Sequence, residues 1–469
     1  ALRKGLVLDE FHSYFHATRT SFGAFFDTLL ADNHPPLSFL VLHAAQAVLG
    51  DGALALRAPA IVFGLFEIVL AGQLARRLPS AGGRIAALAM ALLAASSLHL
   101  DFSTQARMYA LHATCVTGLT LALHTLATTN ESARSASVLL VLWSVLGFHN
   151  HYFFVQYATV AGVATLAVVA LTPALRSRLR RFVLPVVATV LLCLPWLAWG
   201  FRHQWTHALP PGGDDAGLKG LLEAFVHLFF LNVRLGGPEL RMLFIGCGAA
   251  AAACGALSAL RLLATSREPA ARALAVLLTA TAFGVPLLAA VAASSLGRAG
   301  FTWHYVLPSA AALAVLLADF ACAAGPLVRV RRAIVGVIGA SALLLSVLHV
   351  TSRGTEDYPG AVEHVLATHR PGDAIVSVEW QPALFPQGQP WDYYAPRLAQ
   401  GSPPPRARMS GFSVADPRDL AQAERVLVLR TSLPGDQHLM QLLLERFEVA
   451  SRADFGFGVE VLEFVPRED

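Results

Sequence analysis

The feature that most constrains this chain is a series of long apolar segments that fills most of residues 54–351. A helix needs about 20 apolar residues to cross a bilayer. Ionised side chains are costly in hydrocarbon, and charged residues make up only 14% of this chain, against about a quarter in soluble proteins. The sequence therefore predicts an all-α polytopic membrane protein. Its ten predicted spans are 54–75, 84–100, 109–128, 136–150, 152–171, 182–200, 240–262, 273–296, 304–324 and 333–351.

The loops between these predicted spans alternate in charge, and this alternation predicts their orientation. One set of loops is rich in arginine and the other set is acidic. Cytoplasmic loops carry an excess of Lys and Arg, so we expect the acidic loops and both chain ends on the extracytoplasmic face. An N-terminus on that face needs an earlier segment, so we expect one further spanning helix before Ala1. The arginine-rich loops hold Arg76, Arg77, Arg84, Arg134, Arg176, Arg178, Arg180, Arg181, Arg261, Arg267, Arg272, Arg329, Arg331 and Arg332.

Composition divides the chain into three predicted parts. Residues 1–53 are predicted to form an extracytoplasmic loop with juxtamembrane helices, and residues 54–351 a transmembrane bundle of about ten helices. Residues 352–469 carry an ordinary share of charge and are predicted to form a small extracytoplasmic α/β domain. The apolar segment 37–49 is too short to span and suits a helix at the membrane surface. In the last part we expect strands at 374–379 and 425–430, helices at 357–369 and 435–447, and an irregular connection at 381–418.

Net charge and cysteine content exclude several classes of protein. The formal net charge is only +4 over 469 residues, which gives no basis for nucleic-acid binding. The five cysteines all lie in apolar runs and form no CxxC pair. They therefore predict neither a disulfide framework nor a zinc site.

Two adjacent acids in the first outer segment are the leading candidates for chemistry. Asp9 and Glu10 are flanked by apolar residues close to the predicted membrane surface. An acid in this place can cap a helix or act as a general base, and the sequence leaves both open. His12 and His16 share a helical face, but no HExxH pattern is present, and surface histidines are the commoner explanation. We assign no metal ligands, although a divalent metal stays possible.

An outward-facing arginine marks the second outer loop. Arg107 lies in DFSTQARMY, where it departs from the rule that arginines face the cytoplasm. An arginine at membrane depth needs an anionic partner. Asp101, Asp9, Glu10 or a lipid phosphate can supply one, so a structural ion pair and a functional site both stay open.

Other polar residues lie at predicted outer helix ends. His34 precedes the stiff Pro35-Pro36 pair, and Arg298 and His304 are cationic groups on an otherwise acidic face. Glu67 lies inside a predicted span, and its role is left open.

Taken together, these motifs resemble the GT-C superfamily of membrane glycosyltransferases, near the family 39, protein mannosyltransferase-like members with an ArnT-like fold. The resemblance covers roughly residues 5–350. The matching motifs are Asp9-Glu10, His34-Pro35-Pro36-Leu37, Arg57-Ala58-Pro59, Ser103-Thr104-Gln105-Ala106-Arg107-Met108-Tyr109 and His304-Tyr305-Val306-Leu307-Pro308. Gln105 stands where the family usually has Glu, and His304 where it usually has Arg.

The resemblance implies transfer of a sugar from a polyprenyl-phosphate donor to a hydroxyl acceptor, with inversion of configuration. Asp9, beside Glu10, would take the acceptor's proton. The acceptor would be a lipid, a glycan or a protein, and the location a bacterial inner membrane. The donor phosphate would lie against Arg107, Tyr109, Arg298, His304 and Tyr305, with His34, Asp101 and Gln105 in support.

Two other classes of protein remain as alternatives. A transporter or flippase would bind near the bilayer midplane and often shows internal repeats, whereas the polar residues here gather at one face. A non-catalytic relative that binds a lipid carrier is kept open by Gln105 and His304. The enzyme hypothesis requires Asp9 and Arg107 to line one outer cavity.

Overall fold

The structure is a computed structural model that describes most of the chain. It forms two compact units, which are described one at a time. The helical unit comprises Leu29–Ala45 and Arg57–Thr351, and the α/β unit comprises Ala1–Thr28, Gln46–Leu56 and Ser352–Asp469. The described residues are 5–18, 21–78, 82–130, 133–207, 218–231, 233, 237–296, 303–351, 356–378, 390–399, 401–404, 407–410, 413–414, 420, 423–431, 437–456 and 458–467.

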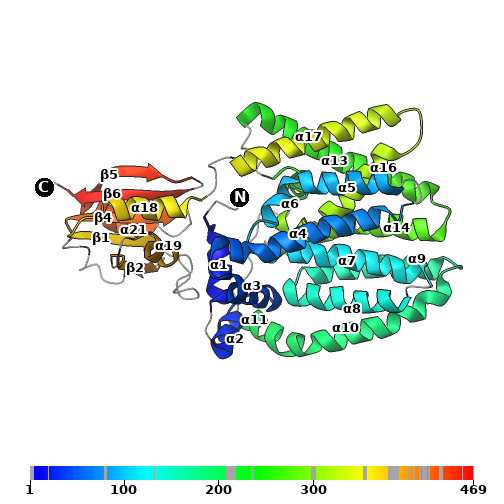
Figure 1. Ribbon diagram of the computed structural model, residues 1–469, viewed down its shortest axis with the longest axis horizontal. Coiled ribbons are helices and arrows are strands. Elements are labelled where there is room, and N and C mark those ends of the chain that lie inside the picture. Colours follow the sequence, from blue (N-terminus) through cyan, green and yellow to red (C-terminus); the bar gives the residue numbers. More distant parts are fainter. Residues whose placement is uncertain are drawn as a thin grey trace. The chain divides into compact units, whose positions relative to one another are not determined.

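Long apolar helices build the helical unit, and many run with roughly parallel axes (Figure 1). Within the described residues, seven helical segments are long and apolar enough to cross a membrane. These segments are α4 (Ala53–Ala75), α7 (Tyr109–Thr128), α9 (Phe154–Leu171), Arg176–Trp205 containing α10 (Val183–Trp196), α13 (Gly237–Thr265), Pro269–Val291 containing α14 (Pro269–Thr279) and the start of α15 (Val285–Leu296), and α17 (Val328–Thr351).

The other three predicted spans are also helices: α5 (Gly82–Ala95), α8 (Ala133–Asn150) and α16 (Ser309–Cys322). Two of them are shorter than predicted. The segment 84–100 breaks at Ser96, whose hydroxyl accepts the N–H of His99 and starts a separate helix, α6 (Ser97–Phe102). The segment 304–324 becomes a regular α-helix only after Pro308, which has no N–H to donate.

Burial within the helical unit separates inner from outer helices. Nearly all of α7 is buried, and α16 lies in the same large apolar core as α5 and α13. In contrast, α10 carries exposed apolar side chains such as Leu184 and Leu191, which are 76% and 61% exposed. A soluble protein rarely displays such an apolar surface, so this pattern fits contact with lipid.

Shorter helices of the helical unit include most of α3 (Leu37–Leu49), α11 (Arg202–His207) and α12 (Leu218–His227). The bounds of α3 are those predicted for the surface helix. α12 packs on α13, and its Ala224 is fully buried.

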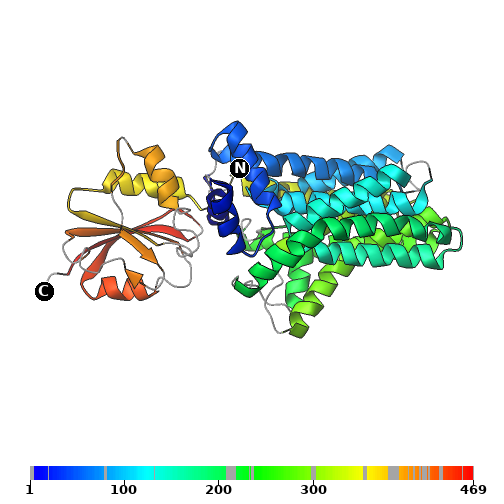
Figure 2. The same cartoon turned by 90° about the horizontal axis from the view of Figure 1, so that it is seen from below.

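A six-stranded mixed sheet forms the centre of the α/β unit, with strand order β3-β2-β1-β4-β6-β5. Strand β1 runs parallel to β2 and β4, and the other neighbours are antiparallel. Figure 2 shows α18 on one face of the sheet and α21 on the other. The bounds are β1 (Asp373–Val378), β2 (Ala407–Ser410), β3 (Ser413–Val414), β4 (Arg425–Thr431), β5 (Phe447–Asp454), β6 (Val459–Pro466), α18 (Tyr358–Thr368) and α21 (Gln437–Leu444).

The predicted strands and helices of the last part are confirmed as β1, β4, α18 and α21. The prediction of an irregular connection at 381–418 is wrong in part, because it contains α19 (Pro390–Leu398) and the strands β2 and β3. α19 is nine residues long and contains Pro396, so its sequence lacks a helical signal. Packing of Trp391 and Tyr394 stabilises it instead. The α/β unit also holds two N-terminal helices, α1 (Leu8–Ala17) and most of α2 (Phe22–Leu30).

Candidate functional site

The acidic pair of the first outer segment lies in the first turn of α1, in the α/β unit. Glu10 is fully buried, and its Oε2 accepts the backbone N–H of Val7 at 2.9 Å. A glutamate at this position that reaches back to the N-cap amide stabilises the start of a helix. Asp9 is exposed. Glu10 therefore caps α1, which is one of the two open interpretations, and the role of Asp9 as a base stays a prediction.

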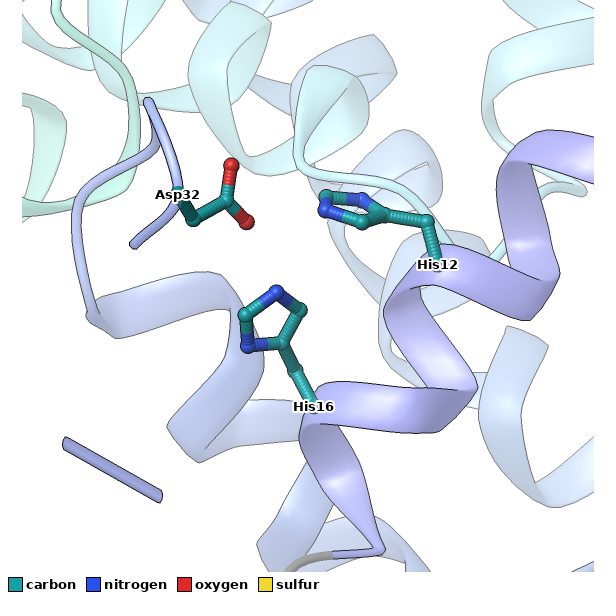
Figure 3. A group of neighbouring side chains, drawn as sticks. All are labelled: His12, His16 and Asp32. Atoms are coloured by element: carbon teal, nitrogen blue, oxygen red, sulfur yellow. The ribbon is translucent and has the colours of Figure 1, made fainter. Parts of the chain in front are cut away.

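Two histidines follow on the next turns of α1. Figure 3 shows the imidazoles of His12 and His16 on the same side of the helix, and their centroids are 4.9 Å apart. The preferred explanation, surface histidines, is wrong, because His12 is 5% exposed and His16 is fully buried. Imidazole pairs spaced i, i+4 are suited to zinc, although the sequence analysis assigns no metal ligands here.

At the start of the helical unit, an acid orients a histidine. Nδ1 of His34 lies 2.9 Å from Oδ1 of Asp32, the third residue labelled in Figure 3. Gln204 fixes the backbone here, since its Nε2 donates to the carbonyl oxygens of Leu29 and His34, each at 2.8 Å. The side chain and the backbone of His34 are therefore both fixed by hydrogen bonds.

Several of the predicted phosphate-binding residues lie together in the helical unit. The guanidinium of Arg107 is 5.7 Å from the ring centroid of Tyr109. The Tyr109 ring in turn lies 4.9 Å from His304, and His304 lies 4.6 Å from Tyr305. Arg107 and Tyr109 lie at the start of α7, and His304 and Tyr305 lie in the turn before α16, so folding joins segments about 200 residues apart.

His151 connects this group to His34, and the sequence analysis did not single it out. Its ring lies 5.2 Å from Tyr305, 5.9 Å from Tyr109 and 6.3 Å from His34. Burial, reinforced by neighbouring histidines and Arg107, lowers the pKa of His151 well below its ordinary value. The imidazole is therefore neutral at pH 7. Its Nδ1 accepts the N–H of Phe153, so Nε2 carries the proton. The available signal was the polar run His149-Asn150-His151 at the end of an apolar segment.

The substituted position Gln105 belongs to a second polar group. Its Nε2 donates to Oδ2 of Asp101 at 2.8 Å, and Oδ1 of Asp101 lies 2.8 Å from Nε2 of His349. An amide donor satisfies the carboxylate here, whereas a glutamate would place two acids in contact. Asp101 is thus paired with Gln105 and His349.

A small open pocket lies beside Arg107. Its wall combines this one cation with a mostly apolar surface. A guanidinium binds phosphate strongly, and an apolar wall suits a hydrocarbon chain. The other lining residues are Ser38, Val41, Leu42, Pro59, Ala60, Phe63, Met108, Leu111 and Asn150.

Two predicted features are left as predictions. Arg298 lies outside the described residues. Asp9 and Arg107 belong to different units, so their convergence on one cavity also stays a prediction. Glu67 lies in α4 with its Oε2 3.3 Å from Nε2 of His99, and both side chains are buried.

Part of the chain matches a known protein family. Residues 33–199 match the family model of dolichyl-phosphate-mannose-protein mannosyltransferases. This segment contains Arg107, Tyr109 and every lining residue of the pocket. No curated protein sequence matches the chain.

Solved structures share the fold over most of the chain. ArnT from Cupriavidus metallidurans in the apo state has a TM-score of 0.62 and 13% identity, and the match covers 98% of this chain and 94% of ArnT. ArnT bound to undecaprenyl phosphate has a TM-score of 0.57 with the same identity and coverage. The archaeal oligosaccharyltransferase AglB from Archaeoglobus fulgidus, in complex with an inhibitory peptide and a dolichol-phosphate, has a TM-score of 0.52 and 11% identity, covering 91% of this chain and 66% of AglB.

The predicted fold class and family resemblance are confirmed by these findings. Residues 33–199 therefore resemble the protein mannosyltransferases, and the chain shares the fold of the solved structures of ArnT and AglB.

Proposed function

We propose that this protein transfers a sugar from a polyprenyl-phosphate-linked donor to a hydroxyl group on the extracytoplasmic face of a bacterial inner membrane. The observation that carries the proposal is the pocket beside Arg107, which joins one cation to an apolar wall inside the family-matched segment. Undecaprenyl phosphate and dolichol-phosphate are bound by the similar proteins ArnT and AglB, and both combine an anionic head with a long apolar tail.

The donor phosphate would lie against Arg107, with Tyr109, His304 and Tyr305 next to it. Arg298 completes this proposed set. When the bond between the anomeric carbon and the phosphate oxygen breaks, the electron pair stays on the phosphate. The guanidinium stabilises that developing charge more strongly than it stabilises the intact donor, which lowers the barrier.

Asp9 is the proposed general base. Its carboxylate would take the proton of the acceptor hydroxyl while the hydroxyl oxygen attacks the anomeric carbon. Attack from the side opposite the phosphate inverts the configuration at that carbon. The acceptor is a hydroxyl-bearing lipid, glycan or protein. Glu10 supports the reaction indirectly, because it caps the helix that carries Asp9.

Transfer of labelled sugar from polyprenyl-phosphate donors by the purified protein tests this proposal. Asp9→Asn keeps the size of the side chain and removes the base, so we expect kcat to fall by about 10²–10⁴-fold. Asp27→Asn is the matched control, because Asp27 is an exposed acid on the nearby helix α2. Equal activity of both variants would remove Asp9 from its proposed role, and absence of transfer by the wild type with every donor would refute the function.

A further inference from the structure

The helix that carries Asp9 packs within an aromatic cluster of the α/β unit. Phe11, on α1, is 1% exposed. Its ring makes edge contacts with Tyr358 of α18 and with Tyr393 and Tyr394 of α19, at centroid distances of 5.6, 5.9 and 5.9 Å. Such aromatic pairs contribute beyond the area they bury, so the cluster attaches α1 to the C-terminal part of the chain.

A buried hydrogen bond fixes the start of the same helix. The backbone N–H of Leu6 donates to the hydroxyl of Tyr394 at 2.6 Å, across 388 residues of sequence. Gly5 allows this close approach. A Cβ atom added at Gly5 would lie 2.5 Å from the ring of Pro359 and 2.9 Å from the Tyr394 hydroxyl. Neither the rigid proline ring nor the bonded hydroxyl can give way without moving α1.

These contacts matter because α1 is too short to hold its own position. A ten-residue helix is only marginally stable by itself in water. Asp9 lies two residues before Phe11, and a helix turns by about 100° per residue. Anchoring Phe11 and Leu6 therefore sets the direction in which the Asp9 carboxylate points.

We propose that the C-terminal domain positions the catalytic helix, with Tyr394, Phe11 and Gly5 as positioning residues that aim Asp9 at the acceptor. This inference rests on the proposed function and assigns that domain a part in catalysis. A misplacement of about 1 Å can lower a rate by about a hundredfold. Loosening the anchor should therefore lower kcat and leave the KM for the lipid donor nearly unchanged, because the proposed donor pocket belongs to the helical unit.

Paired glycine variants give the first test. Gly5→Ala introduces the clash with Pro359, whereas Gly23→Ala adds a methyl group on α2 with nothing within 4 Å. We expect Gly5→Ala to lower kcat by about ten- to a hundredfold with the donor KM changed by less than about twofold. Gly23→Ala should behave as the wild type. Equal kcat values for the two variants would overturn the inference.

Paired tyrosine variants test the hydrogen bond alone. Tyr394→Phe removes the hydroxyl that accepts from Leu6, and Tyr393→Phe removes a hydroxyl that donates to the backbone oxygen of Asp51 at 3.0 Å. Both keep the ring beside Phe11. We expect only Tyr394→Phe to lower kcat and to speed amide hydrogen exchange in residues 6–17.

Hydrogen exchange also separates this inference from the proposed function. If the wild type transfers no sugar, the function fails, and the anchor is then judged by exchange alone. Faster exchange of α1 in Tyr394→Phe than in Tyr393→Phe supports the anchor. Equal exchange in the two variants shows that Tyr394 does not hold α1. If Asp9→Asn is inactive but Gly5→Ala and Tyr394→Phe retain full kcat, the base assignment stands and the positioning role is refuted.

Discussion

Replacing Arg107 by glutamine is expected to weaken binding of undecaprenyl phosphate while leaving binding of undecaprenol unchanged. Arg107 is half-buried and is the only charged side chain among the described residues that line its pocket. A hydrogen bond to a charged group contributes about 1.5–3 kcal/mol. At about 1.4 kcal/mol per factor of ten, Arg107→Gln should raise the Kd about 10- to 150-fold.

The size of this effect depends on the apolar character of the pocket. Side chains such as Leu42, Phe63 and Leu111 line the wall, and low local polarity strengthens the interaction of a guanidinium with a phosphate. The Kd of Arg107→Lys for undecaprenyl phosphate should lie between those of the wild type and Arg107→Gln, because lysine keeps the charge and loses the bidentate hydrogen bonding.

Titration of each variant in detergent with undecaprenyl phosphate and with undecaprenol, followed by native mass spectrometry, gives both affinities. Arg241→Gln is the matched control, because Arg241 is an exposed arginine at the start of α13, away from the pocket. If the Kd of a folded Arg107→Gln variant for undecaprenyl phosphate changed by less than about twofold, the phosphate would lie elsewhere. If the affinity for undecaprenol fell by the same factor, the arginine would support the shape of the pocket and would not bind the charge.

Two further predictions concern stability. Gln105→Glu should lower the free energy of unfolding by about 1–3 kcal/mol as the pH rises from about 5 to 8, because a second carboxylate would face Asp101 once both ionise. Thermal unfolding across that range checks this, with Gln105→Met as a control that loses the hydrogen bond without the pH dependence; a flat profile for Gln105→Glu would contradict the geometry. Arg425→Met should destabilise the sheet by about 2–3 kcal/mol at pH 7, because Arg425 binds Asp373 and Glu463. Hydrogen bonding to Arg425 lowers the pKa of Glu463, so the wild type has this stability above the ordinary glutamate pKa and loses it as the pH falls through the lowered value. Amide hydrogen exchange in β4 and β6 should therefore be faster in the variant than in the wild type at pH 7, and the protection of the two proteins should converge at about pH 3. Equal exchange at pH 7 would contradict the proposed contribution of Arg425 to stability.

Local hydrophobicity was enough to predict most of the helices. The predicted segments 109–128 and 37–49 have the bounds of α7 and α3, because runs of apolar residues between polar loops are a property of neighbouring residues. The same reasoning failed at 84–100, where the hydroxyl of Ser96 starts a new helix inside an apolar run. It also failed for α19, whose stability comes from contacts with distant residues.

In the candidate site too, the sequence indicated some residues and missed others. Sequence motifs indicated Asp9, Arg107, Tyr109 and His304, because the order and spacing of these residues resemble a family pattern. They did not indicate that His151 lies between His34 and Tyr305, since that contact joins three separate loops.

The sequence alone determined that this protein has a membrane bundle followed by an α/β domain, because hydropathy and charge act over a few neighbouring residues. Only the tertiary structure decided that Glu10 caps α1, that Gln105 satisfies Asp101, and that the hydroxyl of Tyr394 accepts the N–H of Leu6 just before α1. The physical reason is that a hydrogen bond or an aromatic contact depends on positions within a few ångströms. Packing of the whole chain sets those positions, and no local pattern of residue types encodes them.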